Sequence, residues 1–407
     1  MMPGGAITLR AELMKVYRQA VDRLSGRRQV AEFLFDHPFN SPFHVLAVGK
    51  AALSMAEGAH EVGGDCLRSG LVIHPLQQSA EQAPDSFTTL PAEHPLPGPG
   101  SFRAGKAVLD FMDSLPLDEP LLVLLSGGGS SLMEAPRKGV SEQDLHAVHE
   151  WLLGSGLDIV DVNRVRQCLS AVKGGALARR LNGCPAQVLC LSDVPPGQLP
   201  ALASGPFLPP LGGSLPPLPD WISVLVGDYR SDATAAIRHH LLADAATLRN
   251  QVAAMCEDWD LPVRVMDEWL EGDAADVGRR LAETVLEAPP GIHVWSGETT
   301  VTLPQASGQG GRCQQLALAA AERLEGQSNV YFLACGSDGL DGPSGDAGAV
   351  VDGETVARGS SGELTAEDAL DWADAGRFLG AAGDLVHIGP TETNINDLII
   401  GLKLPSR

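Results

Sequence analysis

Two cations of this sequence stand beside glycines, at positions suited to phosphate chemistry. Lys50 follows the apolar run that ends at Val48-Gly49, and Arg312 follows Gly310-Gly311 just before a helical apolar pattern. A lysine acts on phosphate as a point charge, and an arginine at a helix start can neutralise a transferring phosphoryl group. The alternatives are an exposed lysine at a helix N-terminus and a surface hairpin before an ordinary helix. We favour the phosphate role for Lys50, because a lysine beside the positive end of a helix dipole has a slight cost, and we keep Arg312 as a second candidate for catalysis.

A run of glycines and serines follows the apolar run 121–125. Three glycines leave backbone N–H groups unobstructed and the serines add hydroxyl donors, so a helix that starts there completes an anion cradle. The run is neither a Walker loop nor G-x-G-x-x-G, and the alternative is a glycine turn needed only for packing. We predict a phosphate, nucleotide or substrate site formed by Ser126, Gly127, Gly128, Gly129, Ser130 and Ser131.

Acidic side chains and further polar residues complete the candidate site. Asp338 and Asp341 lie among glycines directly after the apolar run 330–335, where they suit Mg²⁺ or a general base, although for Asp341 an Asp-Gly turn is about as good an explanation. A helix predicted over 161–180 places Arg166 and Lys173 on one face for a substrate carboxylate, against the alternative of a solvated surface. The remaining candidates for substrate or nucleotide binding are Asn163, Arg166, Lys173, Asp193 and Glu298.

The elements that must position these residues alternate along the chain. Buried strands are predicted at 44–48, 71–74, 121–125, 186–191, 222–226, 263–266, 293–295, 330–335 and 347–351, and helices at 141–153, 161–180, 232–256, 274–286 and 312–324. Such alternation predicts mostly parallel sheets covered by helices. A segment rich in proline, from Pro195 to Pro219, is the best candidate for a domain boundary. His239-His240 is read as a helix surface and not as a metal-ligand pair.

Composition narrows the class of protein. A chain of 407 residues is long enough for two domains, and its net charge of −22 argues against a nucleic-acid partner. The seven cysteines include no Cys-x-x-Cys pair, which indicates reduced thiols. The N-terminus has no signal-peptide pattern and the apolar runs are too short to cross a bilayer. We expect a soluble cytoplasmic protein without a membrane partner, and the sequence leaves a homodimer open.

Nine segments in the same order resemble one known family, the glycerate 2-kinases whose C-terminal part is called the MOFRL domain. They are AVGKAALSMAEGA, EHPLPGPGSFRAGKAVLDF, LLSGGGSSLMEAP, VNRVRQCLSAVKGGALAR, LSDVPPGQLPALASGPF, SGETTVTL, GQGGRCQQLALAAA, GSDGLDGPSGDAGAVVDGET and GPTETNINDLI. The resemblance implies an α/β fold with two domains: a Rossmann-like, mostly parallel N-terminal domain over 1–215 and a smaller α/β domain over 216–407. It implies an active site in the inter-domain cleft, and the last segment is a candidate to pack back on the first domain.

The resemblance also implies a reaction: ATP with Mg²⁺ phosphorylates D-glycerate to 2-phosphoglycerate, and Lys50 and Arg312 serve catalysis. Three positions differ from the usual family pattern, because Cys313 and Gln315 replace an asparagine and a glutamate and Glu392 replaces a glycine. Two alternatives stay open. One is an NAD(P)H-dependent hydroxypyruvate reductase, a label that related sequences often carry, and the other is a non-catalytic sugar-acid or nucleotide sensor.

Overall fold

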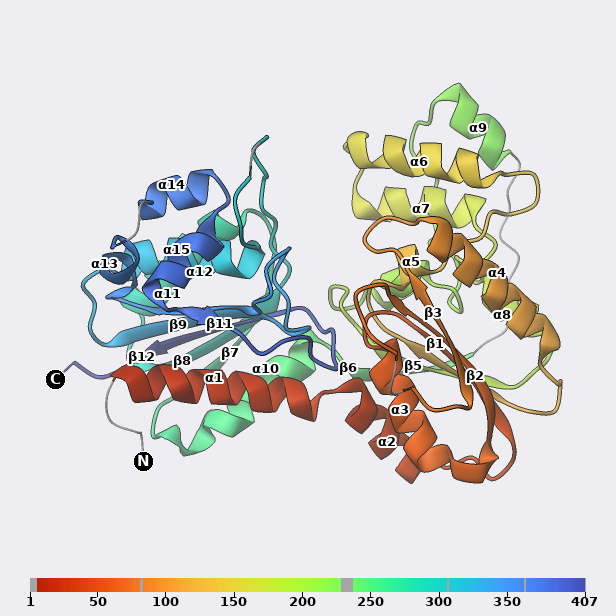
Figure 1. Cartoon of the computed structure of the whole chain (residues 1–407), viewed down its shortest axis with the longest axis horizontal. Helices are drawn as coiled ribbons and strands as arrows, with labels where there is room; N and C mark the ends of the chain where they lie inside the picture. The colour runs from red at the N-terminus through yellow and green to blue at the C-terminus, as the bar shows by residue number, and fades with distance from the viewer. Residues whose placement is uncertain (1–5, 81–82, 228–236, 306, 362–363, 407) are drawn as a thin grey trace. The chain divides into compact units, whose positions relative to one another are not determined.

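The structure, a computed structural model, describes residues 6–80, 83–227, 237–305, 307–361 and 364–406. The chain forms two compact units (Figure 1). Ser25–Leu242 form one, here called the lysine unit because it holds Lys50. Met1–Leu24 and Ala243–Arg407 form the other, here called the arginine unit because it holds Arg312. No helix among the described residues is long and apolar enough to span a membrane.

The lysine unit is built on a six-stranded sheet with the order β3-β2-β1-β4-β5-β6. Its strands are β1 (Phe43–Val48), β2 (Leu67–Pro75), β3 (Phe87–Ala92), β4 (Leu121–Leu125), β5 (Ala186–Leu191) and β6 (Arg238–Ala243). β3, β2, β1, β4 and β5 pair in parallel. This is the Rossmann strand order, which reverses direction between β1 and β4 and opens a ligand site at the carboxyl ends of those two strands. The predicted Rossmann-like parallel sheet is confirmed.

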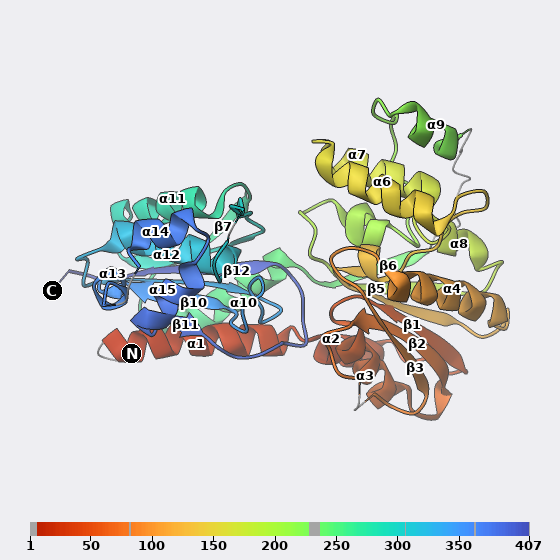
Figure 2. The same ribbon diagram turned by 45° about the horizontal axis from the view of Figure 1, so that its top comes forward.

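Helices cover both faces of this sheet. α2 (Gly26–Asp36) packs on α3 (Ala52–Gly63), which lies on one face, while α4 (Pro99–Ser114) and α8 (Ala176–Arg180) cover the other. A further layer, seen beside α4 in Figure 2, holds α6 (Glu142–Gly154), α7 (Ile159–Leu169) and α9 (Asp220–Val226). The short helix α5 (Gly129–Leu132) packs with α4 and the sheet, and the 3₁₀ helices are Gly64–Cys66 and Leu199–Ser204. The fully buried side chains of Leu46, Val123 and Val108 belong to the core between α4 and the sheet.

The arginine unit has a mixed six-stranded sheet with the order β11-β10-β9-β12-β8-β7. The strands are β7 (Val263–Leu270), β8 (Gly291–Gly297), β9 (Val330–Gly336), β10 (Gly348–Asp352), β11 (Leu385–Val386) and β12 (Asp397–Lys403). Among the strands that the structure describes in this unit, only β7 and β8 pair in parallel; β12 lies antiparallel between β8 and β9, and β10 pairs antiparallel with β9 and β11. The last segment is therefore a central strand of its own unit, because its apolar side chains are fully buried there.

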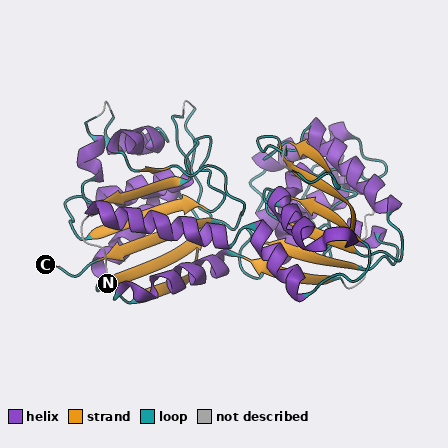
Figure 3. Ribbon diagram, turned by 60° about the horizontal axis from the view of Figure 1, so that its bottom comes forward, coloured by secondary structure: helices purple, strands orange, loops and turns teal. Residues whose placement is uncertain are grey.

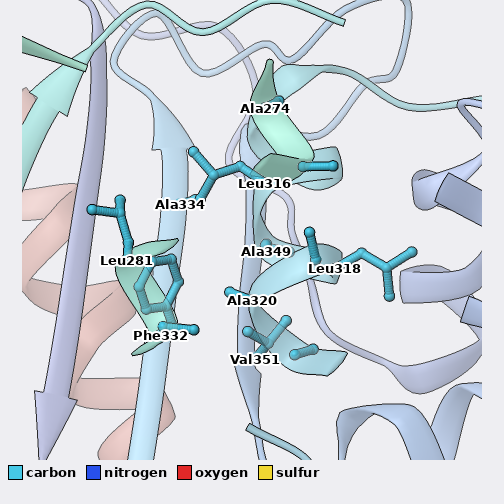
Figure 4. Packing of buried hydrophobic residues seen from close by; sticks show 14 of the residues in the cluster. Ala274, Leu281, Leu316, Leu318, Ala320, Phe332, Ala334, Ala349 and Val351 are labelled. Atoms are coloured by element: carbon cyan, nitrogen blue, oxygen red, sulfur yellow. The ribbon is translucent and has the colours of Figure 1, made fainter. Parts of the chain in front are cut away.

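Two helix layers enclose this second sheet (Figures 1 and 3). One face carries α11 (Ala274–Glu287), α12 (Arg312–Leu324), α13 (Thr355–Gly359), α14 (Ala366–Asp371) and α15 (Ala375–Ala382), and the opposite face carries α1 (Ala6–Arg23) and α10 (Ala245–Cys256), followed by the 3₁₀ turn Glu257–Trp259. Figure 4 shows the core under α11 and α12, where Leu281, Leu316 and Phe332 pack together at 0–1% exposure.

The N-terminal helix belongs to the arginine unit, although it precedes the lysine unit in sequence. Tyr17 of α1 is fully buried and its hydroxyl donates to the carbonyl of Gly336, 2.7 Å away. Arg10 of α1 contacts both Asp352 and Asp384. The chain therefore passes from one unit to the other at Leu24–Ser25 and again at Leu242–Ala243. The sequence predicted domains over 1–215 and 216–407.

Four local predictions are corrected by the structure. The proline-rich segment Pro195–Pro219 lies inside the lysine unit and does not join the two units. The run 222–226 is helical, since a short apolar run does not distinguish a strand from a helix. The predicted helix 161–180 stops at Leu169, because the backbone becomes extended at Ser170, and Gly174 and Gly175, with φ of +55° and +75°, precede the separate helix α8. Of the predicted helix 232–256, residues 232–236 lie outside the described residues, and His239-His240 belong to strand β6.

Candidate active site

In the lysine unit, two loops meet where the strand order reverses. Lys50 follows β1 and its backbone N–H donates to the carbonyl of Gly127, 2.9 Å away, in the loop after β4. Gly49 has a φ of +132°, and a Cβ there would lie 2.2 Å from Ser126 Oγ. A Cβ on Gly128 would lie 3.2 Å from Lys50 Cγ and 3.1 Å from the His94 ring. Two glycines thus let the lysine side chain lie directly on the glycine-rich loop.

The serines of this loop use their hydroxyl groups within the protein. Ser126 Oγ accepts from the Ala51 N–H at 3.0 Å, and Ser126 is fully buried. Ser131 Oγ donates to the Gly128 carbonyl at 3.1 Å. Ser130 Oγ lies 2.7 Å from the hydroxyl of Ser204. Since these contacts occupy the hydroxyls of Ser130 and Ser131, Lys50 and the backbone N–H groups are the better donors to an anion here.

One face of α7 lies against the loop that carries Ser204. The Ser204 hydroxyl donates to Asn163 Oδ1 at 3.1 Å, and Gln167 Nε2 donates to the Ser204 carbonyl at 3.1 Å. Arg166 lies between these two positions in the helix, and its buried Nε has no hydrogen-bond partner among the described residues. Asn163 is therefore linked to the glycine-rich loop through Ser204, and Arg166 lies on the same helix.

Lys173 is placed differently from the prediction. It lies beyond the end of α7 and is 1% exposed, so it does not share a helix face with Arg166. Its Nζ donates to the Met133 carbonyl at 3.2 Å and pairs with Glu134, a fully buried carboxylate just after the glycine-rich loop. Glu134 also accepts from Ser170 Oγ at 2.6 Å. Lys173 thus ties the end of the loop to the turn that follows α7.

The charges around Glu134 leave this region of the lysine unit positive. Burial lowers the pKa of Lys173 while Glu134 opposes that shift, and burial likewise lowers the pKa of Arg166, again opposed by Glu134. His149 lies 3.8 Å from the Glu134 carboxylate, but burial and then the cations Lys173 and Arg166 lower its pKa to about 3. With His149 neutral, two cations face one carboxylate, which suits an anionic ligand in a chain with a net charge of −22.

In the arginine unit, Arg312 is held by two carboxylates. It opens α12, and its Nε and Nη2 bond to Oδ2 and Oδ1 of Asp397 at 2.6 and 3.0 Å. Nη1 donates to Glu298 at 2.8 Å. The Asp397 carboxylate raises the pKa of Arg312, in the sense opposite to burial. Strand β12, the turn after β8 and the start of α12 therefore meet at this guanidinium.

Asp341 holds the start of α12. Its Oδ1 and Oδ2 accept the backbone N–H groups of Cys313 and Gln314 at 3.0 and 2.8 Å, and a Cβ on Gly311 would lie 2.3 Å from Oδ1. The side chain is 2% exposed, and burial raises its pKa to about 7 although the two N–H bonds favour the charged form. Both oxygens of Asp341 are thus engaged with the helix that presents Arg312.

Asp338 is the more accessible of the two predicted metal ligands. Its Oδ1 accepts from the Leu340 N–H at 3.2 Å. A Cβ on Gly336 would lie 3.2 Å from Asp338 Oδ1 and 3.5 Å from Asp397 Oδ1, so the two carboxylates converge beside that glycine. The described residues contain no group of three or more His, Cys, Asp and Glu side chains that could hold a metal ion by itself. The pair fits a Mg²⁺ that takes its other ligands from phosphate and water.

Comparison with known proteins assigns the family. Residues 12–213 match a domain of unknown function, DUF4147, and residues 291–397 match the MOFRL family. The chain is 34% identical to the D-glycerate 2-kinase of Thermotoga maritima, over 88% of this chain and 90% of the relative. It belongs to the glycerate 2-kinase family with a MOFRL domain.

Other members support this assignment. A glycerate 2-kinase of Pyrococcus horikoshii is 29% identical over 89% of this chain and 88% of its own length. A putative hydroxypyruvate reductase of Agrobacterium vitis is 30% identical over 96% of this chain and 94% of its own. The crystal structure of the Thermotoga maritima glycerate kinase superposes with a TM-score of 0.87 at 31% identity, covering 97% of this chain and 99% of that one.

The positions where this member of the family departs from the usual pattern have local explanations. Cys313 is 1% exposed and belongs to the core beneath α12. Gln315 Nε2 donates to the carbonyl of Leu370 at 2.8 Å, so its amide ties α12 to the end of α14. Glu392 is exposed. The remaining candidate, Asp193, follows β5 and is partly buried.

Three residues of these two sites were missed by sequence reasoning. Glu134, Ser204 and Asp397 lie within segments that resemble the family, but none is a charged or polar residue among glycines at a strand end. Asp397 directly precedes the apolar run 398–400, which is a sequence signal for a strand start. Ser204 and Glu134 have no comparable signal, because their contacts join segments 36 to 74 residues apart.

Proposed function

We propose that this protein transfers the γ-phosphoryl group of ATP to D-glycerate and forms 2-phosphoglycerate. The proposal rests on one positioned cation in each unit. Lys50 lies on the glycine-rich loop, and Arg312 forms a two-pronged ion pair with Asp397. Phosphoryl transfer depends mainly on positioned positive charge around the transferring group. The family relationship to glycerate 2-kinases supplies the acceptor.

In the lysine unit, the ligand is proposed to lie over the glycine-rich loop. Lys50 neutralises phosphate charge there, and backbone N–H groups of Gly127, Gly128 and Gly129 add donors. Arg166, whose Nε lacks a partner among the described residues, binds the carboxylate of the acid. This assignment keeps the proposed binding role of Arg166, leaves Asn163 to act through Ser204, and gives Lys173 the structural task of holding Glu134.

In the arginine unit, Arg312 is proposed to meet charge that develops on the transferring group. Asp397 and Glu298 fix the plane of its guanidinium, and Asp341 fixes the helix from which it projects. Asp338, with Asp397 beside it, would hold Mg²⁺ together with the phosphates. When bound, the metal neutralises phosphate oxygens. Catalysis then needs residues of both units, since neither unit has both cations.

A reductase is the second candidate, and one observation favours it: the strand order of the lysine unit is that of dinucleotide-binding domains. Against it stands the turn after β1, where such a domain carries G-x-G-x-x-G. This chain has Gly49-Lys50-Ala51-Ala52 there, and Lys50 lies on the neighbouring loop. A lysine in that place suits a mononucleotide or acid phosphate better than the pyrophosphate of a nicotinamide cofactor.

One assay separates the candidates. The purified protein is incubated with D-glycerate, ATP and MgCl₂, and in parallel with hydroxypyruvate and NADH or NADPH. A kinase releases ADP only when glycerate is present and yields 2-phosphoglycerate, which phosphorus NMR distinguishes from the 3-phospho isomer. Oxidation of the nicotinamide without ADP release would support the reductase and reject the kinase. Neither reaction, with ligand binding retained, would support a sensor.

A further inference from the structure

A chain of three polar side chains runs from the glycine-rich loop into the interior of the lysine unit. Ser130 Oγ lies 2.7 Å from Ser204 Oγ, and Ser204 Oγ donates to Asn163 Oδ1 at 3.1 Å. Ser130 is partly exposed, whereas Ser204 is 0% and Asn163 6% exposed. Ser130 is therefore the end of the chain that a ligand can reach.

The protons of this chain can be assigned by counting. A serine hydroxyl has one proton to donate. Ser204 gives its proton to the Asn163 carbonyl oxygen, so the short contact between the two serines must be a hydrogen bond donated by Ser130. The proton of Ser130 is then used, and its oxygen has only lone pairs left. Ser130 can accept a hydrogen bond from a ligand but cannot donate one.

The backbone around Ser204 is held in place at a conformational cost. Ala203 and Ser204 have φ of +50° and +59°, a region that residues other than glycine seldom adopt. The Ser204 carbonyl accepts from the Gly174 N–H at 3.0 Å and from Gln167 Nε2 at 3.1 Å. Strain of this kind persists only where the surroundings determine it, and it gathers at ligand sites. The hydroxyl of Ser204 is thus fixed between Ser130 and Asn163.

The neighbouring charges indicate which ligand brings the donor. Arg166 shares α7 with Asn163 and has a buried Nε without a partner among the described residues, which suits a carboxylate. A carboxylate and a phosphate both only accept hydrogen bonds, so neither suits Ser130 in this state. A ligand with a hydroxyl group close to a carboxylate offers a hydrogen-bond donor to Ser130 and an acceptor to Arg166. This combination describes a hydroxy acid with a second hydroxyl group.

We propose that Asn163 and Ser204 act as positioning residues that turn Ser130 into an acceptor for the non-reacting hydroxyl of the acid substrate. For the proposed function, on which this inference rests, that group is the 3-hydroxyl of D-glycerate. The arrangement selects dihydroxy acids over acids such as D-lactate, which lacks the 3-hydroxyl. A site built to bond a substrate hydroxyl discriminates because its own polar group loses a partner when the hydroxyl is absent.

The test measures binding of D-glycerate and D-lactate by calorimetry in the presence of a non-hydrolysable ATP analogue and MgCl₂. The wild-type protein is expected to bind glycerate about 10-fold more tightly than lactate, the worth of one buried hydrogen bond. Ser204→Ala and Asn163→Leu free the Ser130 proton and should bring this ratio close to one. Asn163→Asp keeps an acceptor for Ser204, so it should keep the ratio even if both acids bind more weakly.

Controls separate the possible failures. Ser114→Ala removes a hydroxyl that donates to the Phe111 carbonyl elsewhere in the lysine unit, and it should leave both affinities unchanged. If Ser204→Ala does not fold, as judged by thermal unfolding, the Asn163→Asp and Asn163→Leu pair decides. The proposal would be overturned by equal ratios of glycerate to lactate affinity in that pair or by a wild-type ratio near one. Variants that weaken only the binding of the nucleotide would overturn it as well. Kinase turnover is measured separately. A binding preference for glycerate without ADP release would reject the kinase function but retain the role of Ser130 as a hydrogen-bond acceptor.

Discussion

Arg312 and Asp397 form a two-pronged ion pair, in which Nε and Nη2 of the arginine lie 2.6 and 3.0 Å from the two carboxylate oxygens. Such pairs fix the plane of the guanidinium as well as its position. Glu298 takes a third N–H at 2.8 Å. The arginine is therefore oriented before any substrate arrives, and two of its contacts are carboxylates that a phosphate or a metal ion can compete for.

Replacing either cation should affect turnover more than substrate binding. Lys50→Ala and Arg312→Ala each remove a positioned charge that meets the transferring group, and loss of one such contact costs about 10²–10³-fold in kcat. Steady-state kinetics with D-glycerate and ATP give kcat and KM separately. Lys403→Ala is the control, because this lysine bonds the carbonyls of Leu286 and Ala288 at the end of α11. Near wild-type turnover in either variant would remove that residue from the proposed mechanism.

Magnesium should bind firmly only together with the nucleotide. Asp338 and Asp397 supply too few oxygens for a site made by protein alone, and Mg²⁺ usually keeps several waters and phosphate ligands. Calorimetry on metal-free protein should show little binding of Mg²⁺ until ATP is added. Asp338→Asn should raise the Mg²⁺ concentration at half-maximal rate, while Asp371→Asn, an exposed aspartate of the same unit, should not. Tight Mg²⁺ binding without ATP would contradict this arrangement.

The Lys173–Glu134 pair should matter for stability. Lys173→Met leaves the fully buried Glu134 carboxylate without its cation, and breaking such a pair costs about 3–5 kcal/mol. The double variant Lys173→Met/Glu134→Gln removes both charges and should recover much of that loss. Chemical denaturation of the three proteins measures it. A single variant as stable as the wild type would show that the pair does not hold the glycine-rich loop.

The sequence predicted the layers of the fold better than the contacts between distant segments. Most buried strands were located within a few residues, because each is a continuous apolar run such as 121–125. The helix 161–180 was predicted too long, because the backbone becomes extended at Ser170 inside a helical spacing, and the run 222–226 was wrong since its length fits either element. Glycines drew attention to Lys50, which follows β1, and to Arg312, which opens α12. The contact of Lys50 with Gly127 and that of Arg312 with Asp397 depend on which strands become neighbours, and local sequence does not specify that.

Ionisation of Asp341 should make the arginine unit less stable as the pH rises from 4 to 7. Burial raises its folded-state pKa to about 7 from an unfolded value near 3.8. Between these values the folded protein holds a proton that the unfolded chain has released, so its stabilising effect is complete below about pH 4 and is lost through pH 7. The stability difference between wild type and Asp341→Asn should fall by up to about 1.4 kcal/mol per pH unit. Denaturation at pH 5, 6 and 7 measures it, and a constant difference would contradict the shift.

The attachment of α1 to the arginine unit should depend on Arg10. This side chain, 15% exposed, contacts Asp352 at 3.0 Å and also Asp384, which is 1% exposed. Arg358 contacts the same two carboxylates, at 2.9 and 2.8 Å, so two arginines neutralise two aspartates. Removing Arg10 leaves one cation for both carboxylates and breaks hydrogen bonds to charged groups, each worth about 1.5–3 kcal/mol.

Arg10→Ala should therefore lower the free energy of unfolding by about 2 kcal/mol. The matched control is Lys15→Ala on the same helix. Lys15 is 59% exposed and, among the described residues, pairs only with Glu12 at 3.3 Å, so its loss should change stability by less than about 0.5 kcal/mol. Amide hydrogen exchange adds a local measurement: in Arg10→Ala, α1 and strand β10 should lose protection while the strands of the lysine unit keep theirs. Equal stability of the two variants, or lost protection spread evenly over both units, would show that the ionic cluster does not fasten this helix.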